Sequence, residues 1–312
     1  RMQTGEIILE EGALRALPEV VRRYGHGGAV RVVCDENTLA AAGRDALNRL
    51  QKAGIPAAAL VFSNGVAADE RAVERMRTDA ADAGCLVAAG SGTIHDICRY
   101  AAARTGAVFL SLPTAPSVDG FVSSVAAMTF GGCKATSPAV PPAAVVADTD
   151  VLAHAPRRLI AAGAGDILGK FTCLCDWEIS SLVTSETFCR KLAAIETQAA
   201  RDVLQSCGEL ARGGREAVNG LMNALLASGL AMQLNGDSRP ASGAEHHLSH
   251  FWEMRFLREG RAPALHGAKV GVATVIMADI YHRAAGLFRS GPLRWEKPEI
   301  TRAVGALLKY LG

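Results

Sequence analysis

The first 150 residues alternate between short β-rich runs and stretches with helical periodicity, and this alternation constrains the fold more than any other feature. Strands that alternate with helices need crossover connections, which place the strands parallel in one sheet with helices on both faces. The pattern therefore predicts a doubly wound α/β fold. The expected strands are 6–9, 29–34, 57–62, 85–89, 108–112 and 145–147, and the expected helices are 12–24, 38–53, 70–83 and 94–104.

After Asp148 the pattern becomes helical throughout. A chain of 312 residues exceeds the size that one hydrophobic core usually reaches, so two domains are expected. We place an α/β domain in residues 1–150 and an all-helical domain in residues 151–312. The expected helices of the second domain are one that begins at Pro156, then 167–182, 185–208, 215–234, 242–257, 269–286 and 297–311.

Charge and cysteine usage exclude several functional classes. The net charge is only +2, so bulk electrostatic binding of nucleic acid is not expected. We find no run of about 18 apolar residues that would span a membrane, and the mixed, charged residues 1–10 do not form a signal peptide. The eight cysteines are scattered without a Cys-x-x-Cys motif, which favours reduced thiols in a cytoplasmic protein.

A glycine turn at Gly90-Ser91-Gly92-Thr93 joins the expected strand 85–89 to the expected helix 94–104. Glycines there let the backbone approach a ligand, and the helix N-terminus offers free N–H groups to a diphosphate. Position alone leaves the turn equally open to a purely steric explanation, and the Rossmann glycine spacing is absent. Asp35 follows another strand and could accept hydrogen bonds from a ribose, although its position alone favours a helix cap.

The segment 113–137 is long, rich in Ser, Thr, Gly and Pro, and contains one acid, Asp119, and one base, Lys134. Long segments of this kind inside a compact domain are usually functional or disordered, and its apolar residues argue against disorder. We expect a binding loop or hairpin that covers a ligand. A hairpin flap without ligand contact is the alternative.

Histidines cluster on the expected helix 242–257, for which Ser242 and Glu245 suggest a capping box. His246 and His250 are four residues apart and share a face, and His266 lies 16 residues beyond, in an expected turn before the next helix. Such clustering favours a metal site over a polar surface face. Asp166, in the small-residue run AAGAGDILGK, is the candidate carboxylate ligand, because small neighbours let the backbone pack tightly around it.

Five ordered stretches closely resemble the glycerol-1-phosphate dehydrogenase family, the metal-dependent branch of the iron-type alcohol dehydrogenase, glycerol dehydrogenase and dehydroquinate synthase superfamily. The resemblance runs from about residue 5 to about residue 285, and the final 25 residues match poorly. The stretches are GSGTIHD (90–96), PTAPSVDGFVSSVAA (113–127), AAGAGDILGK (161–170), SGAEHHLSHFWEM (242–254) and LHGAKVGVAT (265–274).

The resemblance implies a role for each matching residue. Asp166, His246 and His266 match the ligands of a catalytic divalent metal, zinc or nickel. His250 and Asp119 match substrate-contacting residues, and with Asp166 they form the expected catalytic and substrate-binding set. The positions that match the lining of an NAD or NADP site are Asp35, Gly90, Ser91, Gly92, Thr93, Asp96, Thr114, Ala115, Pro116, Ser117, Ser123 and Val125.

These roles imply reduction of dihydroxyacetone phosphate to sn-glycerol 1-phosphate, with the metal as Lewis acid, hydride from the nicotinamide and a proton relayed by His250. Lys134, Lys170 and Arg157 are candidates for the substrate phosphate, and Lys170 could instead pair with Asp166. We expect the small residues around Asp166 to let substrate and nicotinamide approach the metal. A homodimer is the expected assembly.

Three alternatives share parts of this pattern. A glycerol dehydrogenase would use the same three ligands on an unphosphorylated polyol. A dehydroquinate synthase is disfavoured, because that enzyme has a glutamate at the position of Asp166 and more basic residues around its substrate. A non-catalytic dinucleotide-binding protein is disfavoured by the complete ligand set, since such a module has no physical need for an open metal site.

Overall fold

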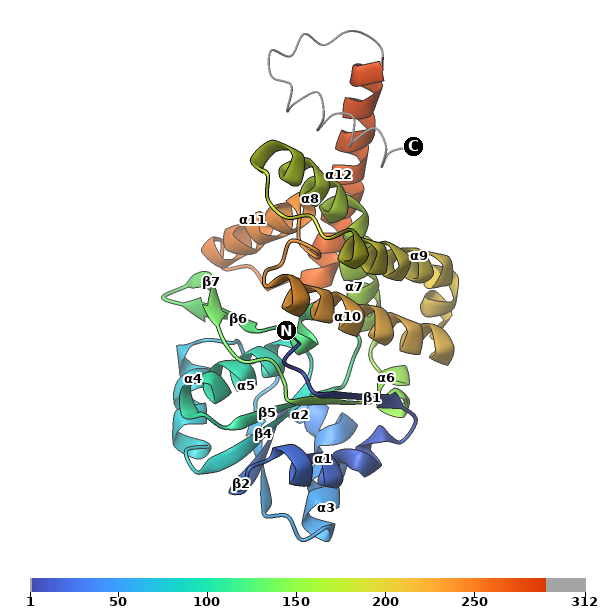
Figure 1. The fold of residues 1–312 in the computed structure, drawn as a ribbon. Helices are drawn as coiled ribbons and strands as arrows, with labels where there is room; N and C mark the ends of the chain where they lie inside the picture. The colour runs from blue at the N-terminus through green and yellow to red at the C-terminus, as the bar shows by residue number, and fades with distance from the viewer. Residues whose placement is uncertain (1, 290–312) are drawn as a thin grey trace.

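The computed structural model describes residues 2–289 of the chain (Figure 1). Six parallel strands form one sheet in the order β1-β8-β5-β4-β2-β3, which confirms the predicted doubly wound fold. Each expected strand is present with its ends shifted by at most two residues. The strands are β1 (Glu6–Glu10), β2 (Ala29–Asp35), β3 (Ala57–Phe62), β4 (Ala83–Gly90), β5 (Val108–Pro113) and β8 (Ala144–Asp148).

Helices cover both faces of the sheet because its strands are apolar on both sides. In β2, Val32 and Cys34 belong to a core with η1 (Ala13–Ala16), α1 (Leu17–Tyr24) and α3 (Arg44–Lys52). Val33 points to the opposite core. The elements on that face are α4 (Glu70–Asp79) and α5 (Gly92–Thr105), and α2 (Glu36–Thr38) and the π-helical turn η2 (Leu39–Gly43) lead into α3.

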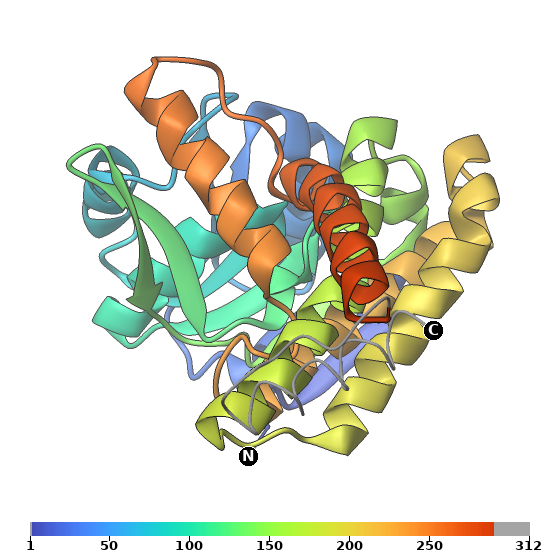
Figure 2. The ribbon, with the colours of Figure 1, turned by 90° about the horizontal axis from the view of Figure 1, so that it is seen from above.

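Every described element after β8 is a helix (Figures 1 and 2). The expected helix 167–182 was wrong at its start, because the chain bends near Gly169 and leaves Asp166 in the last turn of the preceding helix. The expected helix 297–311 lies outside the described residues, and the division at residue 150 stays a prediction. The helices are α6 (Thr149–Ala153), α7 (Arg157–Leu168), α8 (Lys170–Thr184), α9 (Arg190–Arg212), α10 (Arg215–Asn235), α11 (Ala244–Arg258) and α12 (His266–Arg289).

Helix α10 is long and apolar enough, by length and composition alone, to cross a membrane. Half of its apolar stretch is buried, and Leu221, Met222 and Leu225 lie in a core that includes Phe121, Val145 and residues of α7 and α9. A central helix of a helical core passes the same test of composition. We therefore interpret α10 as the core helix of the second half of the chain.

The segment 113–137 forms most of a hairpin, as expected, after a short helix that was not expected. The 3-10 helix η3 (Asp119–Val122) is followed by the antiparallel strands β6 (Val125–Phe130) and β7 (Cys133–Pro138). Gly131 and Gly132 make the turn with φ of 55° and 74°, a region that favours glycine. The hairpin stands away from the sheet on the side of α11 (Figures 1 and 2).

Glycines let α7 and α12 cross at backbone contact. A Cβ added to Gly165 would overlap the carbonyl oxygen of Gly267, and a Cβ on Gly271 would approach Gly165 Cα to 3.0 Å. A Cβ on Gly163 would overlap the carbonyl oxygen of Pro116. The run around Asp166 therefore packs tightly, as expected, but its glycines contact α12 and the loop after β5. Our expectation that the small residues let substrate and nicotinamide approach the metal stays a prediction.

The crossing predicts that Gly165→Ala destabilises the protein by about 1–3 kcal/mol, because the new methyl group forces two backbones apart. The free energy of urea unfolding measures this change. Gly220→Ala on α10 is the matched control, since no heavy atom lies within 4 Å of its added Cβ, and it should stabilise by about 0.5–1 kcal/mol. Equal unfolding midpoints for Gly165→Ala and the unmodified chain would contradict the close crossing.

Candidate metal centre

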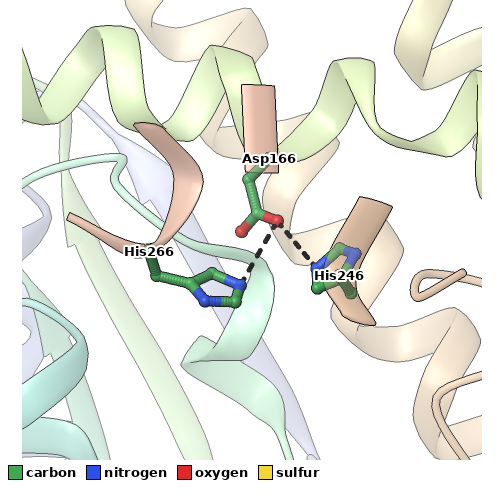
Figure 3. A group of neighbouring side chains, drawn as sticks. All are labelled: Asp166, His246 and His266. Carbon is green, nitrogen blue, oxygen red and sulfur yellow. Dashed lines mark ion pairs between the residues drawn. The ribbon is translucent and has the colours of Figure 1, made fainter. Parts of the chain in front are cut away.

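Asp166 lies at the centre of the site, fully buried in the last turn of α7 (Figure 3). Its Oδ2 accepts the backbone N–H of Asp119 at 3.0 Å. Its Oδ1 has no hydrogen-bond partner, yet it lies 3.4 Å from His246 Nε2 and 3.8 Å from His266 Nε2. One carboxylate oxygen is thus fixed by the protein and the other faces two imidazoles.

His246 is held by the carboxylate that precedes it. Its Nδ1 donates to Glu245 Oε1 at 2.7 Å, and Glu245 also accepts the Gly243 N–H at 2.7 Å and the Thr172 hydroxyl at 2.6 Å. The expected capping box at Ser242 was wrong: the N-cap of α11 is Gly243, and Glu245 is turned inward onto the imidazole. A carboxylate on one ring nitrogen fixes the tautomer that leaves the other free for a ligand.

His266 is the first residue of α12 and not part of a turn before the helix, because α12 begins three residues earlier than expected. The α7–α12 crossing brings it to Asp166. One donor atom from each of Asp166, His246 and His266 lies within 4.8 Å of the others, so the structure brings together the three residues singled out from the sequence.

The three residues shift the pKa values of one another. Burial acts against the charged form of Asp166, but the Lys170 ammonium and the two imidazoles outweigh it and hold the pKa of Asp166 far below its usual range. Burial likewise opposes protonation of His246, yet contacts with Asp166 and Glu245 raise its pKa to about 9. For His266 burial dominates and lowers the pKa to about 4. At neutral pH His246 therefore carries a second ring proton, on Nε2, in addition to the proton on Nδ1.

The donor set fits a divalent metal. A buried carboxylate oxygen without a hydrogen-bond partner needs a cation or donor, because an unpaired buried polar atom is costly. One carboxylate and two imidazoles suit zinc or nickel, and a site with three protein ligands leaves a position open for a substrate. The described residues supply these ligands from three different helices, α7, α11 and α12.

Asp119 is fixed by its own buried partners. Its Oδ2 accepts from Lys170 Nζ at 2.6 Å and from the Ser228 hydroxyl at 3.1 Å. Lys170 is fully buried and lies 3.9 Å from Asp166 Oδ1, so its main partner is Asp119 and not Asp166. The ammonium is thereby occupied, which removes Lys170 as a candidate for the substrate phosphate. Arg157 is also removed, because its guanidinium caps α9 at the carbonyls of Ala211 and Arg212.

Arg99 on α5, a residue that the sequence reading missed, fixes the loop that contains Asp119. Its buried guanidinium donates to the carbonyl oxygens of Ser123 and Gly120, both at 2.5 Å, and of Phe121 at 3.3 Å. Three carbonyls directed at one guanidinium hold η3 in a single orientation. The only sequence signal would have been an arginine in an otherwise apolar helix face.

His250 lies beside the three candidate ligands and remains more accessible. Its ring centroid is 6.4 Å from that of His246 and 5.8 Å from that of His266. Its side chain is 54% exposed, and Nδ1 lies 3.5 Å from Glu253 Oε2. His247, the adjacent residue on α11, is exposed and belongs to no such cluster.

The candidate cofactor residues gather at the carboxyl edge of the sheet. Gly90 ends β4 and Gly92 begins α5, whose N-cap Ser91 makes no side-chain cap hydrogen bond. Asp35 ends the neighbouring strand β2 and caps α2 by accepting the Thr38 N–H at 2.8 Å. The strand order reverses between β2 and β4, and such switch points are where open α/β sheets bind ligands.

The remaining cofactor candidates line the same edge. Thr114, Ala115, Pro116 and Ser117 follow β5, and the Thr114 N–H donates to the Gly90 carbonyl at 3.0 Å. The buried Ser117 hydroxyl has no hydrogen-bond partner, as expected for a group that meets a ligand. Asp96 lies on the first turns of α5. Ser123 and Val125 close a local turn before β6 through hydrogen bonds with one another.

A groove of about 200 Å³ extends from this edge to the helices α11 and α12. Thr93, Asp96 and Lys134 line it from the α/β side, and Glu253 and Lys269 line it from the helical side. The sequence reading did not single out Glu253 or Lys269, because each is an ordinary charged residue of a helix until the groove is formed.

The sequence of the chain is similar to a known enzyme family. Residues 8–156 match the family of iron-containing alcohol dehydrogenases. Over 283 residues, 89% of this chain and 70% of the relative, the sequence is 40% identical to a glycerol-1-phosphate dehydrogenase [NAD(P)+] of Geobacillus thermodenitrificans. Identity is 41% to the enzyme of that name from Bacillus subtilis, over 93% of this chain and 76% of the relative. Across several relatives the chain spans 64% to 82% of their length.

The fold agrees with that family. The structure of a probable glycerol dehydrogenase from Sinorhizobium meliloti superposes with a TM-score of 0.68 at 19% identity, covering 98% of this chain and 97% of that one. This likeness concerns the fold alone. The sequence relatives carry the assignment, and they confirm the resemblance read from the five motifs: the chain belongs to the glycerol-1-phosphate dehydrogenase family.

Proposed function

We propose that this chain catalyses the reversible, NAD(P)-dependent reduction of dihydroxyacetone phosphate to sn-glycerol 1-phosphate at a divalent metal held by Asp166, His246 and His266. The observation that carries the proposal is the convergence of these three donors within 4.8 Å, in a chain about 40% identical to enzymes of that name. The orphaned Asp166 Oδ1 and Ser117 hydroxyl support a metal and a cofactor, respectively.

In this proposal the nicotinamide supplies a hydride, and the metal supplies a Lewis acid for the substrate carbonyl. Glu245 keeps His246 Nε2 free for the metal through its bond at Nδ1. Lys170 and Ser228 hold Asp119 against the candidate ligands. His250, accessible and in contact with Glu253, passes a proton to the product oxygen.

Zinc and nickel both suit the donor set, and the proposed cofactor is NAD or NADP. All eight cysteines lie within the described residues and are free thiols, which supports the proposed cytoplasmic location. A homodimer stays a prediction. A glycerol dehydrogenase remains the second candidate function, because it would use the same three ligands on an unphosphorylated polyol.

The function predicts that metal-loaded protein oxidises NADH or NADPH with dihydroxyacetone phosphate and turns over dihydroxyacetone at least tenfold less efficiently. Absorbance at the nicotinamide wavelength measures both reactions, with zinc or nickel added separately. A preference for dihydroxyacetone would identify a glycerol dehydrogenase. No turnover of either substrate would favour a binding protein.

His246→Ala should abolish metal retention and turnover while the chain still folds, because it removes one of three candidate ligands and His246 belongs to none of the hydrophobic clusters of the described residues. Metal content after purification, turnover and far-UV circular dichroism measure the three properties. The neighbouring His247→Ala is the matched control, since His247 is exposed on the same helix. A metal-free His246→Ala protein with normal activity would falsify the metal mechanism.

Metal affinity should rise with pH. The pKa of His246 in the metal-free protein is about 9, whereas a ligand must be neutral, so metal binding at neutral pH releases one proton. His266, with its pKa lowered to about 4, is already neutral there. We expect the apparent Kd for zinc to fall about tenfold for each pH unit between 7 and 9. Calorimetry in buffers of different ionisation enthalpy counts the proton, and a value of zero at pH 7 would contradict the assignment.

A further inference from the structure

Two lysines from distant parts of the chain meet in the groove beside the metal centre. Lys134 Nζ, on the hairpin strand β7, lies 3.0 Å from Glu253 Oε1. Lys269 Nζ, on α12, lies 3.3 Å from the same oxygen atom. Both ammonium groups are therefore neighbours, and a single carboxylate oxygen of α11 separates them.

This arrangement leaves positive charge uncompensated. Lys269 is only 5% exposed, and a buried ammonium needs an anionic partner of its own. Glu253 is already shared, because its other oxygen lies 3.5 Å from His250 Nδ1. One carboxylate thus serves two lysines and a histidine, and the groove attracts a further anion.

Asp96, the other acidic residue that lines the groove, interacts with Lys134 but is shared with the buried guanidinium of Arg99. Asp96 Oδ1 lies 3.6 Å from Arg99 Nε. Arg261 Nη1 lies 3.5 Å from Glu259 Oε2, and its guanidinium covers the Phe256 ring at 4.2 Å. The local excess of positive charge is therefore located at Lys134 and Lys269.

We propose that Lys134 and Lys269 bind the phosphate of the substrate and set the preference for a phosphorylated triose. This inference rests on the proposed function. Lys269 follows the candidate ligand His266 by three residues, which places its backbone about 4.5 Å further along α12. Residues three apart share a helix face, so Lys269 lies on the same side of α12 as His266, where a substrate whose carbonyl meets the metal centre can direct its phosphate to the two ammonium groups. Glu253 then keeps His250 as its partner.

The paired ammonium groups discriminate between the phosphorylated and the unphosphorylated triose, because only the phosphorylated triose supplies an anion in addition to Glu253. The dihydroxyacetone skeleton makes the same contacts at the metal centre in both substrates. The preference should therefore depend on Lys134 and Lys269 and not on Asp166, His246 or His266.

The test compares Lys134→Met, Lys269→Met and the double variant with Lys52→Met, an exposed lysine at the end of α3. We expect each groove variant to lower kcat/KM for dihydroxyacetone phosphate about 10- to 100-fold, the range for a hydrogen bond to a charged group. The kcat/KM for dihydroxyacetone and the KM for NADH should stay within about twofold of their values in the unmodified protein. Lys52→Met should behave as the unmodified protein.

A second measurement does not depend on turnover. Inorganic phosphate, titrated by calorimetry, should bind the unmodified protein and bind the groove variants at least tenfold more weakly. If the unmodified protein binds phosphate in this way but turns over neither triose, the anion site stands and the proposed function fails. An unchanged ratio of the two kcat/KM values in both single variants overturns the inference. A raised KM for NADH also overturns it, because the lysines would then bind the cofactor.

Discussion

The close crossing of α7 and α12 is the constraint on which the site depends. Asp166 and His266 are 100 residues apart in the sequence, and their side chains meet only because Gly165, Gly267 and Gly271 let the two backbones touch. Side chains of ordinary size would hold helices 8–10 Å apart. The ligand geometry is thus set largely by backbone contact.

Around this crossing, each of three buried side chains is held in place by one ion pair or hydrogen bond. Lys170 fixes Asp119, Glu245 fixes His246, and the Asp119 N–H fixes Asp166 Oδ2. Buried ion pairs of this kind contribute little net stability, but removal of one partner leaves an uncompensated charge. Asp166 Oδ1 is left without a hydrogen-bond partner and faces the imidazoles of His246 and His266.

Much of the fold could be predicted from the sequence, because periodicity reports burial, and burial sets the strands and helices. The errors fell where tertiary contacts override local pattern. The bend near Gly169 and the early start of α12 follow from packing between helices, and Glu245 contacts the N-cap residue Gly243 and His246 instead of forming a capping box with Ser242. The candidate ligands could be named from motifs and spacing, whereas Arg99, Glu253 and Lys269 could not, since their partners come from distant segments.

Arg99 has a consequence beyond the loop that it fixes. Arg99 lies on α5, which begins at the glycine turn, and it donates to the carbonyl oxygens of Gly120 and Ser123. In the same loop, the N–H of Asp119 donates to Asp166 Oδ2. These hydrogen bonds connect the carboxyl edge of the sheet to the candidate ligand Asp166 through one continuous set of contacts. The hairpin β6–β7 and α11 lie outside this set of hydrogen bonds and face each other across the groove, where the ion pair between Lys134 and Glu253 joins them.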